Sequence, residues 1–530
     1  MRILWKSVKM RGYKIRPGLL LFLIIVCGFL FRLNNLTGRS LWTDEFFTMF
    51  QSSGHGMDIE RAGKESAQGN VTPLSRPGYF KRFLENDSSR NIRDVTNSLL
   101  DTDTHPPLYF WIIYAWRRFF GSGPFALRFF SVLVGTLSIF LSYKLGECLF
   151  NRRTGIFCAL FSAFSPFSVI YSQEARAYSL IMAIGLLSSI FLVKLEKEGR
   201  WSDAFLFSLF SAAGLYTHYF YVFTALGHFI YFNLACSGKP VSRKFSFSCL
   251  GTLFIFSPWL AVLAVKGYNF TAAGWIFGYP GFAGRLSEIG TGIAGYLALP
   301  GRPGMAHEIL SFASLFIFSW AAFYGLKEMF IKYRRQAMFC LCMFLVPLAA
   351  MFFVDVIQHG ALLRQERFWM FSFLGFVPLA GYCFNSVFSS HKAFTALFIL
   401  SLAVFSFFSG KTQFGPAPKA ACRWIAREAE GCRAAVFVCN MRGALFPQSY
   451  YMDQSIYLVP VSNASQLANS VEAYAESFDS LFLVRHYHST DDSLMNELFM
   501  ETYNIGKGFI LKKEIEMNGV AVSEFVKKDR

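Results

Sequence analysis

Apolar runs long enough to cross a lipid bilayer recur along this chain and limit what it can fold into. The first, PGLLLFLIIVCGFLFRL, extends from Pro17 to Leu33. A membrane span needs about 20 apolar residues. Hydrophobic residues make up 54% of the 530-residue chain, too many for a water-soluble domain of this size. The sequence therefore predicts an integral membrane protein whose first run stays as a signal anchor, because no convincing small-residue cleavage site follows it.

The apolar runs predict about eleven crossings. They are expected at residues 17–33, 126–148, 155–171, 177–194, 202–217, 219–236, 246–265, 308–326, 337–357, 367–387 and 393–409.

The distribution of basic residues orients these crossings. The start, MRILWKSVKMRGYKIR, is strongly basic and is expected in the cytoplasm. All basic short loops then also fall inside, provided that HPPLYFWIIYAW, residues 105–116, lies along the outer face without crossing. If it crossed, the later motifs would lie on opposite sides of the membrane. Arg117 and Arg118 behind it are expected at lipid headgroups.

The predicted topology gives two domains. Residues 1–410 form the membrane domain with a long first outer loop, 34–125, and residues 411–530 form a small extracytoplasmic α/β domain. A helical stretch, PKAACRWIAREAEG, and the β runs AAVFVCN, SIYLVPV, SLFLVRHY and KGFILKKEI alternate in this tail. The formal charge of +17 follows from the basic loops of a membrane protein, and no nucleic-acid partner is expected.

Polar and charged side chains expected at the outer face are the candidates for chemistry, because charge near the membrane interior is costly and is usually kept for a site. They are Asp44 with Glu45, His105, Glu174 with Arg176, His218 with Tyr219, and Arg364 with Arg367.

Asp44 lies about ten residues beyond the first span. Near a low-dielectric cavity with cations close by, its carboxylate is suited to accept a proton from a hydroxyl group as a general base. The alternative is that Asp44 and Glu45 cap the segment EFFTMF as a helix.

The other candidates have structural alternatives as well. Glu174 and Arg176 are two residues apart, so they face different partners, or they form a solvated turn. His105 and His218 suit hydrogen bonding or metal ligation, or are ordinary interfacial residues. Arg364 and Arg367 suit a phosphate group, or extend to lipid headgroups.

Nucleotide-binding motifs are absent from the sequence, which has no Walker A loop and no glycine-rich dinucleotide fingerprint. No nucleotide cofactor is therefore expected. A transferase acting at the outer face would use a lipid donor that carries its own phosphate.

Five blocks in order, LWTDEFFT, DTHPPLYFW, FNRRTG, SPFSVIYSQEARAYSL and RQERFWMFSFLGFVPLAGY, resemble the signature blocks of GT-C type membrane glycosyltransferases. The chain is similar to the bacterial glycosyltransferase family 39-like group, which is related to protein O-mannosyltransferases and to aminoarabinose transferases of lipid A. The resemblance covers roughly residues 15–390.

The resemblance implies a GT-C fold and a donor sugar on a polyprenyl phosphate. It implies that Asp44, with Glu45 beside it, is the catalytic base of an inverting transfer at the outer face of the cytoplasmic membrane. It places Glu174 in an acidic loop that helps to position the donor phosphate, the acceptor or a metal. His105 and Tyr109 of HPPLY, Arg176, His218 and Tyr219 are further candidates for substrate binding, and His105 and Glu174 are candidate ligands if a divalent metal is bound. An arginine is expected at the donor phosphate. Arg364 and Arg367 are the alternatives, because the chain reads Arg367-Phe368 where the family has Arg-Tyr.

The acceptor implied is a hydroxyl group of a glycolipid, a cell-envelope glycan or a protein. The alternative function is that of a lipid or sugar transporter. Transporters place ionisable or helix-breaking residues in repeat-related spans near the bilayer midplane. Here the candidates gather at one face and no repeat is visible in the sequence, which favours the enzyme.

Overall fold

The computed structural model contains two compact units. It describes residues 8–10, 13–59, 61–62, 71, 73–236, 240–266, 281–298, 305–410, 417–439, 445–461, 463–486, 509–517 and 520–527. The first unit comprises residues 1–36, 104–109 and 128–411, and the second comprises residues 37–103, 110–127 and 412–530.

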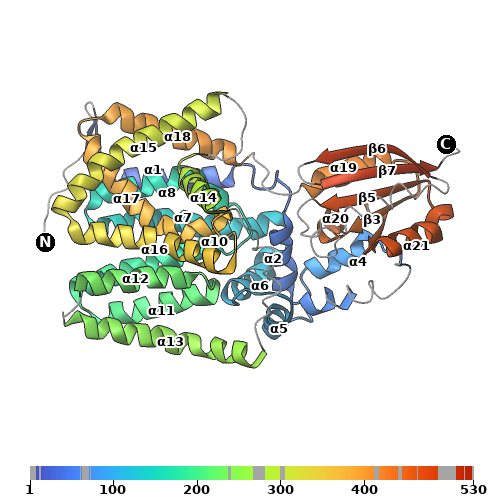
Figure 1. Cartoon of the computed structure of the whole chain (residues 1–530), viewed down its shortest axis with the longest axis horizontal. Coiled ribbons are helices and arrows are strands. Elements are labelled where there is room, and N and C mark those ends of the chain that lie inside the picture. Colours follow the sequence, from blue (N-terminus) through green and yellow to red (C-terminus); the bar gives the residue numbers. More distant parts are fainter. Residues whose placement is uncertain are drawn as a thin grey trace. The chain divides into compact units, whose positions relative to one another are not determined.

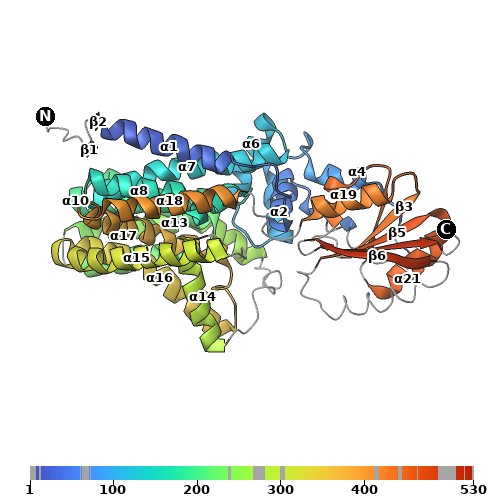
Figure 2. The same ribbon diagram turned by 90° about the horizontal axis from the view of Figure 1, so that it is seen from above.

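The first unit is built from helices, most of which run alongside one another, whereas α14 points in another direction (Figures 1 and 2). A short hairpin, β1 (Val8–Met10) and β2 (Tyr13–Ile15), precedes them. The helices are α1 (Pro17–Leu33), α7 (Pro124–Leu149), α8 (Arg152–Phe164), α9 (Pro166–Ser172), α10 (Tyr178–Glu198), α11 (Trp201–Thr217), α12 (Tyr221–Cys236), α13 (Val241–Lys266), α14 (Gly281–Gly295), α15 (Met305–Lys332), α16 (Arg334–Gln358), η3 (Glu366–Trp369), α17 (Met370–Phe388) and α18 (Lys392–Ser409).

Every predicted crossing falls on a helix or on a bent helix pair. Among the described residues, seven helices are long and apolar enough to span a membrane, and the bent pair α8 and α9 gives an eighth. The helices α1 and α12 are apolar but shorter. The prediction of a polytopic helical membrane protein is therefore confirmed.

Helix α17 lies in the core of the first unit, where nearly all of its side chains are buried. A Cβ atom at Gly375 would lie 2.4 Å from the backbone nitrogen of Phe344 and 2.5 Å from the carbonyl oxygen of Cys340. Only glycine therefore fits where α17 crosses α16, which is how small residues allow membrane helices to approach closely.

The bend between α8 and α9 measures 59° and is stabilised by Arg32 of α1. Pro166 has no backbone N–H group, so the carbonyl of Ser162 lacks its helical partner. The Arg32 guanidinium replaces it, donating to the carbonyls of Ser162 at 2.9 Å and Ala163 at 3.2 Å. It also donates to the Ser168 and Ser172 hydroxyls at 2.8 and 3.1 Å. A fully buried arginine thus takes over the broken hydrogen bonding of another span.

The second unit combines the first outer loop with the C-terminal tail. The loop provides α2 (Thr43–Ser53), α4 (Pro77–Lys81), η1 (Arg82–Leu84), α5 (Ile92–Thr102) and most of α6 (Leu108–Phe120). The tail provides α19 (Pro418–Glu428), β3 (Ala434–Cys439), α20 (Phe446–Tyr451), β4 (Tyr457–Val461), α21 (Ala464–Tyr474), η5 (Ala475–Ser477), β5 (Ser480–His486), β6 (Phe509–Met517) and β7 (Val520–Lys527).

The tail folds as the predicted α/β domain around a five-stranded sheet of order β4-β3-β5-β7-β6. Strands β4, β3 and β5 are parallel, and β7 and β6 are antiparallel additions. Leu467 of α21 packs with Leu483 on one face. Trp424 of α19 contacts Phe482 on the other. The two helices therefore cover opposite faces of the sheet (Figure 2).

The outer loop packs directly on this α/β domain. Ser75 forms an antiparallel bridge with Leu458 at the end of the sheet where β4 lies. The Arg76 guanidinium lies 3.6 Å over the ring of Tyr457 and donates to the carbonyl of Gln454 at 3.0 Å. The compact units thus group the loop with the tail, whereas the predicted domain boundary near residue 410 leaves it with the membrane domain.

Arg117 corrects one expectation. It does not extend to lipid headgroups but is buried, and it donates to the Ser52 hydroxyl at 2.8 Å and to the carbonyls of Met49 and Leu84. Burial lowers the pKa of Arg117 to about 10, so it stays charged at neutral pH. Its role is to join α6 to α2 and η1 within the second unit.

Candidate functional site

The segment YSQEARAYS, residues 171–179, is anchored to the end of α1. Gln173 is fully buried, and its side-chain amide donates to the carbonyls of Arg32 at 3.0 Å and Asn34 at 2.9 Å. Helix C-termini leave carbonyl groups without partners, and this amide satisfies them. Glu174 and Arg176 are buried in the same segment, so they do not form the solvated turn of the alternative interpretation.

Arg176 contacts His105. Nη2 of Arg176 lies 3.2 Å from Nε2 of His105. A guanidinium group has only donors, so Nε2 of His105 is the acceptor and the imidazole carries its proton on Nδ1. The structure therefore brings together two predicted residues that are 71 positions apart.

His218 lies beside this pair in the short loop between α11 and α12. Its ring is 6.0 Å from that of His105 and is also packed against the rings of Phe220, Phe368 and Phe371. Removal from water lowers the pKa of His218 well below its usual value, and the neighbouring His105, Arg176 and Arg367 add to the effect. Nδ1 of His218 accepts the backbone N–H of Phe220 at 3.1 Å, which leaves Nε2 as the donor.

His218 should make stability pH-dependent. The unfolded chain binds a proton at His218 below about pH 6.5, whereas the folded chain does not, so stability falls as the pH drops through this range. The loss approaches about 1.4 kcal/mol per pH unit. Thermal unfolding in detergent between pH 7 and 5 should show a weaker pH dependence for His218→Asn than for the wild type. An unchanged dependence would contradict the assignment, and the exposed His359→Asn variant is the control.

Arg367 completes the cluster, which we call the imidazole–arginine cluster and define as His105, Arg176, His218 and Arg367. Arg367 is close enough to His218 to affect it electrostatically. The carbonyl of Glu174 accepts the backbone N–H of Arg176 at 2.8 Å, so Glu174 lies next to the cluster in the chain.

Arg364 belongs to a different group. It is exposed and interacts with Glu288, which also interacts with Asp355 and Arg285. The Asp355 carboxylate accepts the backbone N–H groups of Leu362 and Leu363 at 2.6 and 2.9 Å. The structure therefore separates the two alternative arginines and places only Arg367 in the imidazole–arginine cluster.

The two predicted tyrosines lie in packed surroundings of the first unit. Tyr109 is buried, and its ring lies 6.3 Å from that of Phe130. The Tyr219 hydroxyl accepts the indole N–H of Trp259 of α13 at 2.9 Å. Tyr219 directly follows His218, so this bond also holds the loop that carries the imidazole.

Asp44 and Glu45 begin α2 in the second unit, where they have different surroundings. Glu45 is fully buried, and its carboxylate accepts the backbone N–H of Trp42, the N-cap residue of α2, at 3.2 Å. Asp44 is half-buried in the first turn. The capping interpretation therefore describes Glu45.

Residues of the C-terminal tail pack against α2, a contact that no sequence motif predicted. The backbone N–H of Leu41 donates to the Tyr451 hydroxyl at 2.9 Å. The ring of Phe46 lies 5.7 Å from that of Tyr450 and 6.3 Å from that of Tyr451. Both tyrosines belong to α20, about 400 residues away along the chain. No local motif predicts such a contact.

His105 and Glu174 are the candidate metal ligands of the sequence analysis. Across the described part of the chain, no group of three or more His, Cys, Asp or Glu side chains is arranged to hold a metal ion. We therefore assign no metal ligands.

Comparison with known proteins gives a family match over part of the chain and a fold for nearly all of it. Residues 104–262 match the sequence model of a family described as dolichyl-phosphate-mannose-protein mannosyltransferase. A search of curated protein sequences finds no match to the chain.

Two solved structures resemble the chain over nearly its whole length. ArnT from Cupriavidus metallidurans, in a crystal structure with undecaprenyl phosphate, is 12% identical with a TM-score of 0.54, over 96% of this chain and 97% of ArnT. The oligosaccharyltransferase AglB from Archaeoglobus fulgidus, in complex with an inhibitory peptide and a dolichol-phosphate, is 10% identical with a TM-score of 0.51, over 96% of this chain and 74% of AglB.

At these identities the structural likeness gives the fold, and the family match over residues 104–262 indicates the activity class. A transporter function is not supported by either comparison. The chain is a membrane glycosyltransferase of the GT-C type.

Proposed function

We propose that the chain transfers a sugar from a polyprenyl-phosphate donor to a hydroxyl group of a glycolipid, an envelope glycan or a protein. The reaction takes place at the outer face of the cytoplasmic membrane, with the tail on the same side. The observation that carries the proposal is the imidazole–arginine cluster, in which the guanidinium groups of Arg176 and Arg367 lie near two imidazoles. ArnT and AglB have been solved with polyprenyl-type phosphates, which supports a donor of this class.

In the proposed reaction, Asp44 takes the proton of the acceptor hydroxyl as it attacks the anomeric carbon. Direct displacement inverts the anomeric configuration, and the lipid phosphate leaves. Arg176 and Arg367 stabilise the charge that grows on the phosphate, because preorganised donors act where charge develops. A phosphate leaving group needs no general acid, so the role proposed for the two imidazoles is hydrogen bonding to the donor and not proton transfer. Glu45 supports Asp44 by capping α2, and Tyr109 and Tyr219 help to shape the donor site.

The proposal is tested with the purified protein in nanodiscs and a panel of radiolabelled polyprenyl-phosphate sugars, with a crude membrane fraction as the acceptor. We expect one sugar of the panel to be transferred with release of polyprenyl phosphate. If no acceptor-dependent consumption occurs with any hexosyl, pentosyl or aminopentosyl donor, the donor class is wrong.

A matched pair of arginine variants tests the position of the donor phosphate. Arg176→Gln removes a buried cation from the cluster and should raise the KM for the donor about tenfold to a hundredfold, since a hydrogen bond to a charged group contributes about 1.5–3 kcal/mol. Arg364→Gln removes an exposed cation outside the cluster and should change this KM less than threefold, roughly the limit of a surface effect. Equal effects of both variants would contradict the assignment.

A further inference from the structure

The second unit contains a charged cavity of about 390 Å³ just beyond the end of α2. Its lining comes from the segment that follows α2 and from the α4–η1 region up to the start of α5. The residues are His55, Asp58, Arg61, Ala62, Tyr79, Arg82, Phe83, Asp87 and Arg90.

The chain is held in the shape that forms this cavity. Gly54 ends α2 with φ of 84°, a left-handed conformation that glycine adopts without strain. The Ser53 hydroxyl donates to the carbonyl of Phe83 at 2.8 Å, and the backbone N–H of Gly56 donates to the Ser98 hydroxyl at 2.7 Å. Three separate segments are therefore fixed around the cavity by hydrogen bonds.

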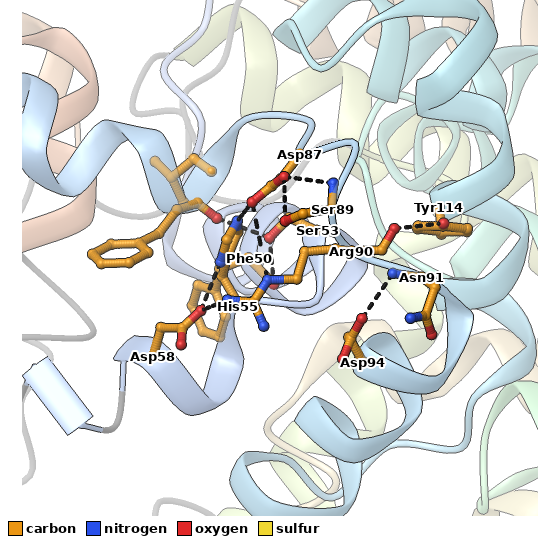
Figure 3. A network of polar contacts seen from close by, with 12 residues as sticks. Phe50, Ser53, His55, Asp58, Asp87, Ser89, Arg90, Asn91, Asp94 and Tyr114 are labelled. Atoms are coloured by element: carbon orange, nitrogen blue, oxygen red, sulfur yellow. Dashed lines mark hydrogen bonds and ion pairs between the residues drawn. The ribbon is translucent and has the colours of Figure 1, made fainter.

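The floor of the cavity is an internally paired charge network (Figure 3). His55 is buried, with Nδ1 2.8 Å from Asp58 and Nε2 3.4 Å from Asp87. Arg90 contacts both carboxylates. Hydrogen bonds from Ser89, with His55 and Arg90 nearby, lower the pKa of Asp87. Both acids of the floor thus already have cationic partners.

The rim of the cavity differs from its floor, because the guanidinium groups of Arg61 and Arg82 keep N–H donors available for a ligand. Arg61 and Arg82 are exposed, and neither has a protein hydrogen-bond acceptor or ion pair among the described residues. The Arg82 guanidinium is stacked 4.3 Å over the ring of Tyr79 and 4.8 Å from that of Phe83. Stacking fixes the plane of the guanidinium while its edge N–H groups stay available for a planar or tetrahedral anion.

The charged and hydrogen-bonding side chains that line the cavity indicate the class of ligand. Three arginines face two carboxylates that are already paired, so the cavity has an excess of positive charge and favours an anion. The imidazole and carboxylate groups of the floor suit the hydroxyl groups of a sugar, and the rim arginines suit an anionic substituent.

We propose that this cavity binds an anionic sugar, a sugar phosphate or a uronic acid, as an anchoring subsite for the acceptor glycan. His55 follows Asp44 by eleven residues, nearly all of them in α2, so the two are separated by roughly 15 Å along the helix. One sugar ring cannot bridge that length. The subsite therefore selects acceptors that are oligosaccharides or glycolipids with an anionic sugar several units from the reacting hydroxyl.

The inference rests on the proposed function for its role in acceptor choice, and a binding experiment without turnover tests it separately. Isothermal titration calorimetry of the full-length protein in zwitterionic nanodiscs would compare glucose 6-phosphate, glucuronate, glucose and inorganic phosphate. We expect saturable binding of the two anionic sugars and much weaker binding of glucose and phosphate. Arg82→Gln and Arg61→Gln should each weaken binding of glucose 6-phosphate about tenfold, and the exposed Arg93→Gln on α5 should leave it unchanged.

Two results would overturn the proposal. If glucose binds as tightly as glucose 6-phosphate, the anion has no role. If free phosphate binds as tightly as the sugar phosphate, the cavity is a simple anion site. If the wild-type protein binds the anionic sugars but transfers no sugar from any donor, the proposed function is wrong while the binding subsite is confirmed.

Discussion

Replacing Asp44 by Asn is expected to lower kcat for sugar transfer by about 10²–10⁴-fold, the usual contribution of a general base. The substitution keeps the size of the side chain, and the Thr48 hydroxyl bonds to the backbone carbonyl of residue 44, so α2 keeps its start. The KM for the donor should change little, because Asp44 acts on the acceptor. Initial rates over a range of donor concentrations separate the two parameters.

Glu45→Gln is the matched control for this prediction, because Glu45 is the capping residue next to Asp44. Because a glutamine can still accept the backbone N–H of Trp42, it should lower stability by only about 0.3–1 kcal/mol through the lost charge at the helix start and leave most of kcat in the folded fraction. If Asp44→Asn retained wild-type kcat while Glu45→Gln abolished it, the two roles would have to be exchanged.

Arg32→Met is expected to lower the free energy of unfolding by about 2–4 kcal/mol. The change leaves the carbonyls of Ser162 and Ala163 without donors in a buried position, and each unsatisfied group costs about 1–3 kcal/mol. Unfolding in mixed micelles with increasing detergent denaturant measures the loss. Arg32→Lys should recover little of it, because one ammonium group cannot match the fork of the guanidinium.

The exposed Arg153→Met variant at the start of α8 provides the comparison for Arg32. It removes the same side chain from a surface position and should change stability by less than about 0.5 kcal/mol. Similar losses in both variants would show that the bend between α8 and α9 does not depend on Arg32.

The helices were predictable because each membrane span is one continuous apolar segment of the sequence. Helix α1 has the predicted bounds, Pro17–Leu33, and the α8–α9 pair covers the predicted crossing 155–171. Within the tail, four of the strands were predicted, but β7 was not. Ser523 and Glu524 interrupt its apolar pattern, although both are buried. Nζ of Lys512 on β6 lies 2.9 Å from Oε1 of Glu524 and compensates the charge of this buried carboxylate. No local sequence pattern predicts this ion pair.

The site was predictable only as a set of separate motifs. The quoted blocks contain His105, Arg176 and Arg367, yet nothing in their spacing shows that they share one cluster or that Arg364 lies elsewhere. The role of Gln173 was also missed, although it stands inside YSQEARAYS, because a buried amide that caps another helix has no sequence signature. Long-range packing decides all of these cases.

The packing of the outer loop on the tail tests the predicted topology. Residues 37–103 and 412–530 form one compact unit, so both must lie on the same side of the membrane. Ten of the predicted crossings separate them, an even number that meets this requirement. An additional crossing by α6 would violate it, which supports the prediction that HPPLYFWIIYAW does not span.

The same packing determines when the enzyme can become active during its synthesis. Helix α2 is made early, but Tyr450, Tyr451 and the β4 end of the sheet, which it and its loop need, come from the last quarter of the chain. Until that segment has been translated, the loop that carries Asp44 lacks these contacts. We therefore expect a polypeptide that stops before residue 445 to leave α2, and with it the proposed base Asp44, without its packing partners.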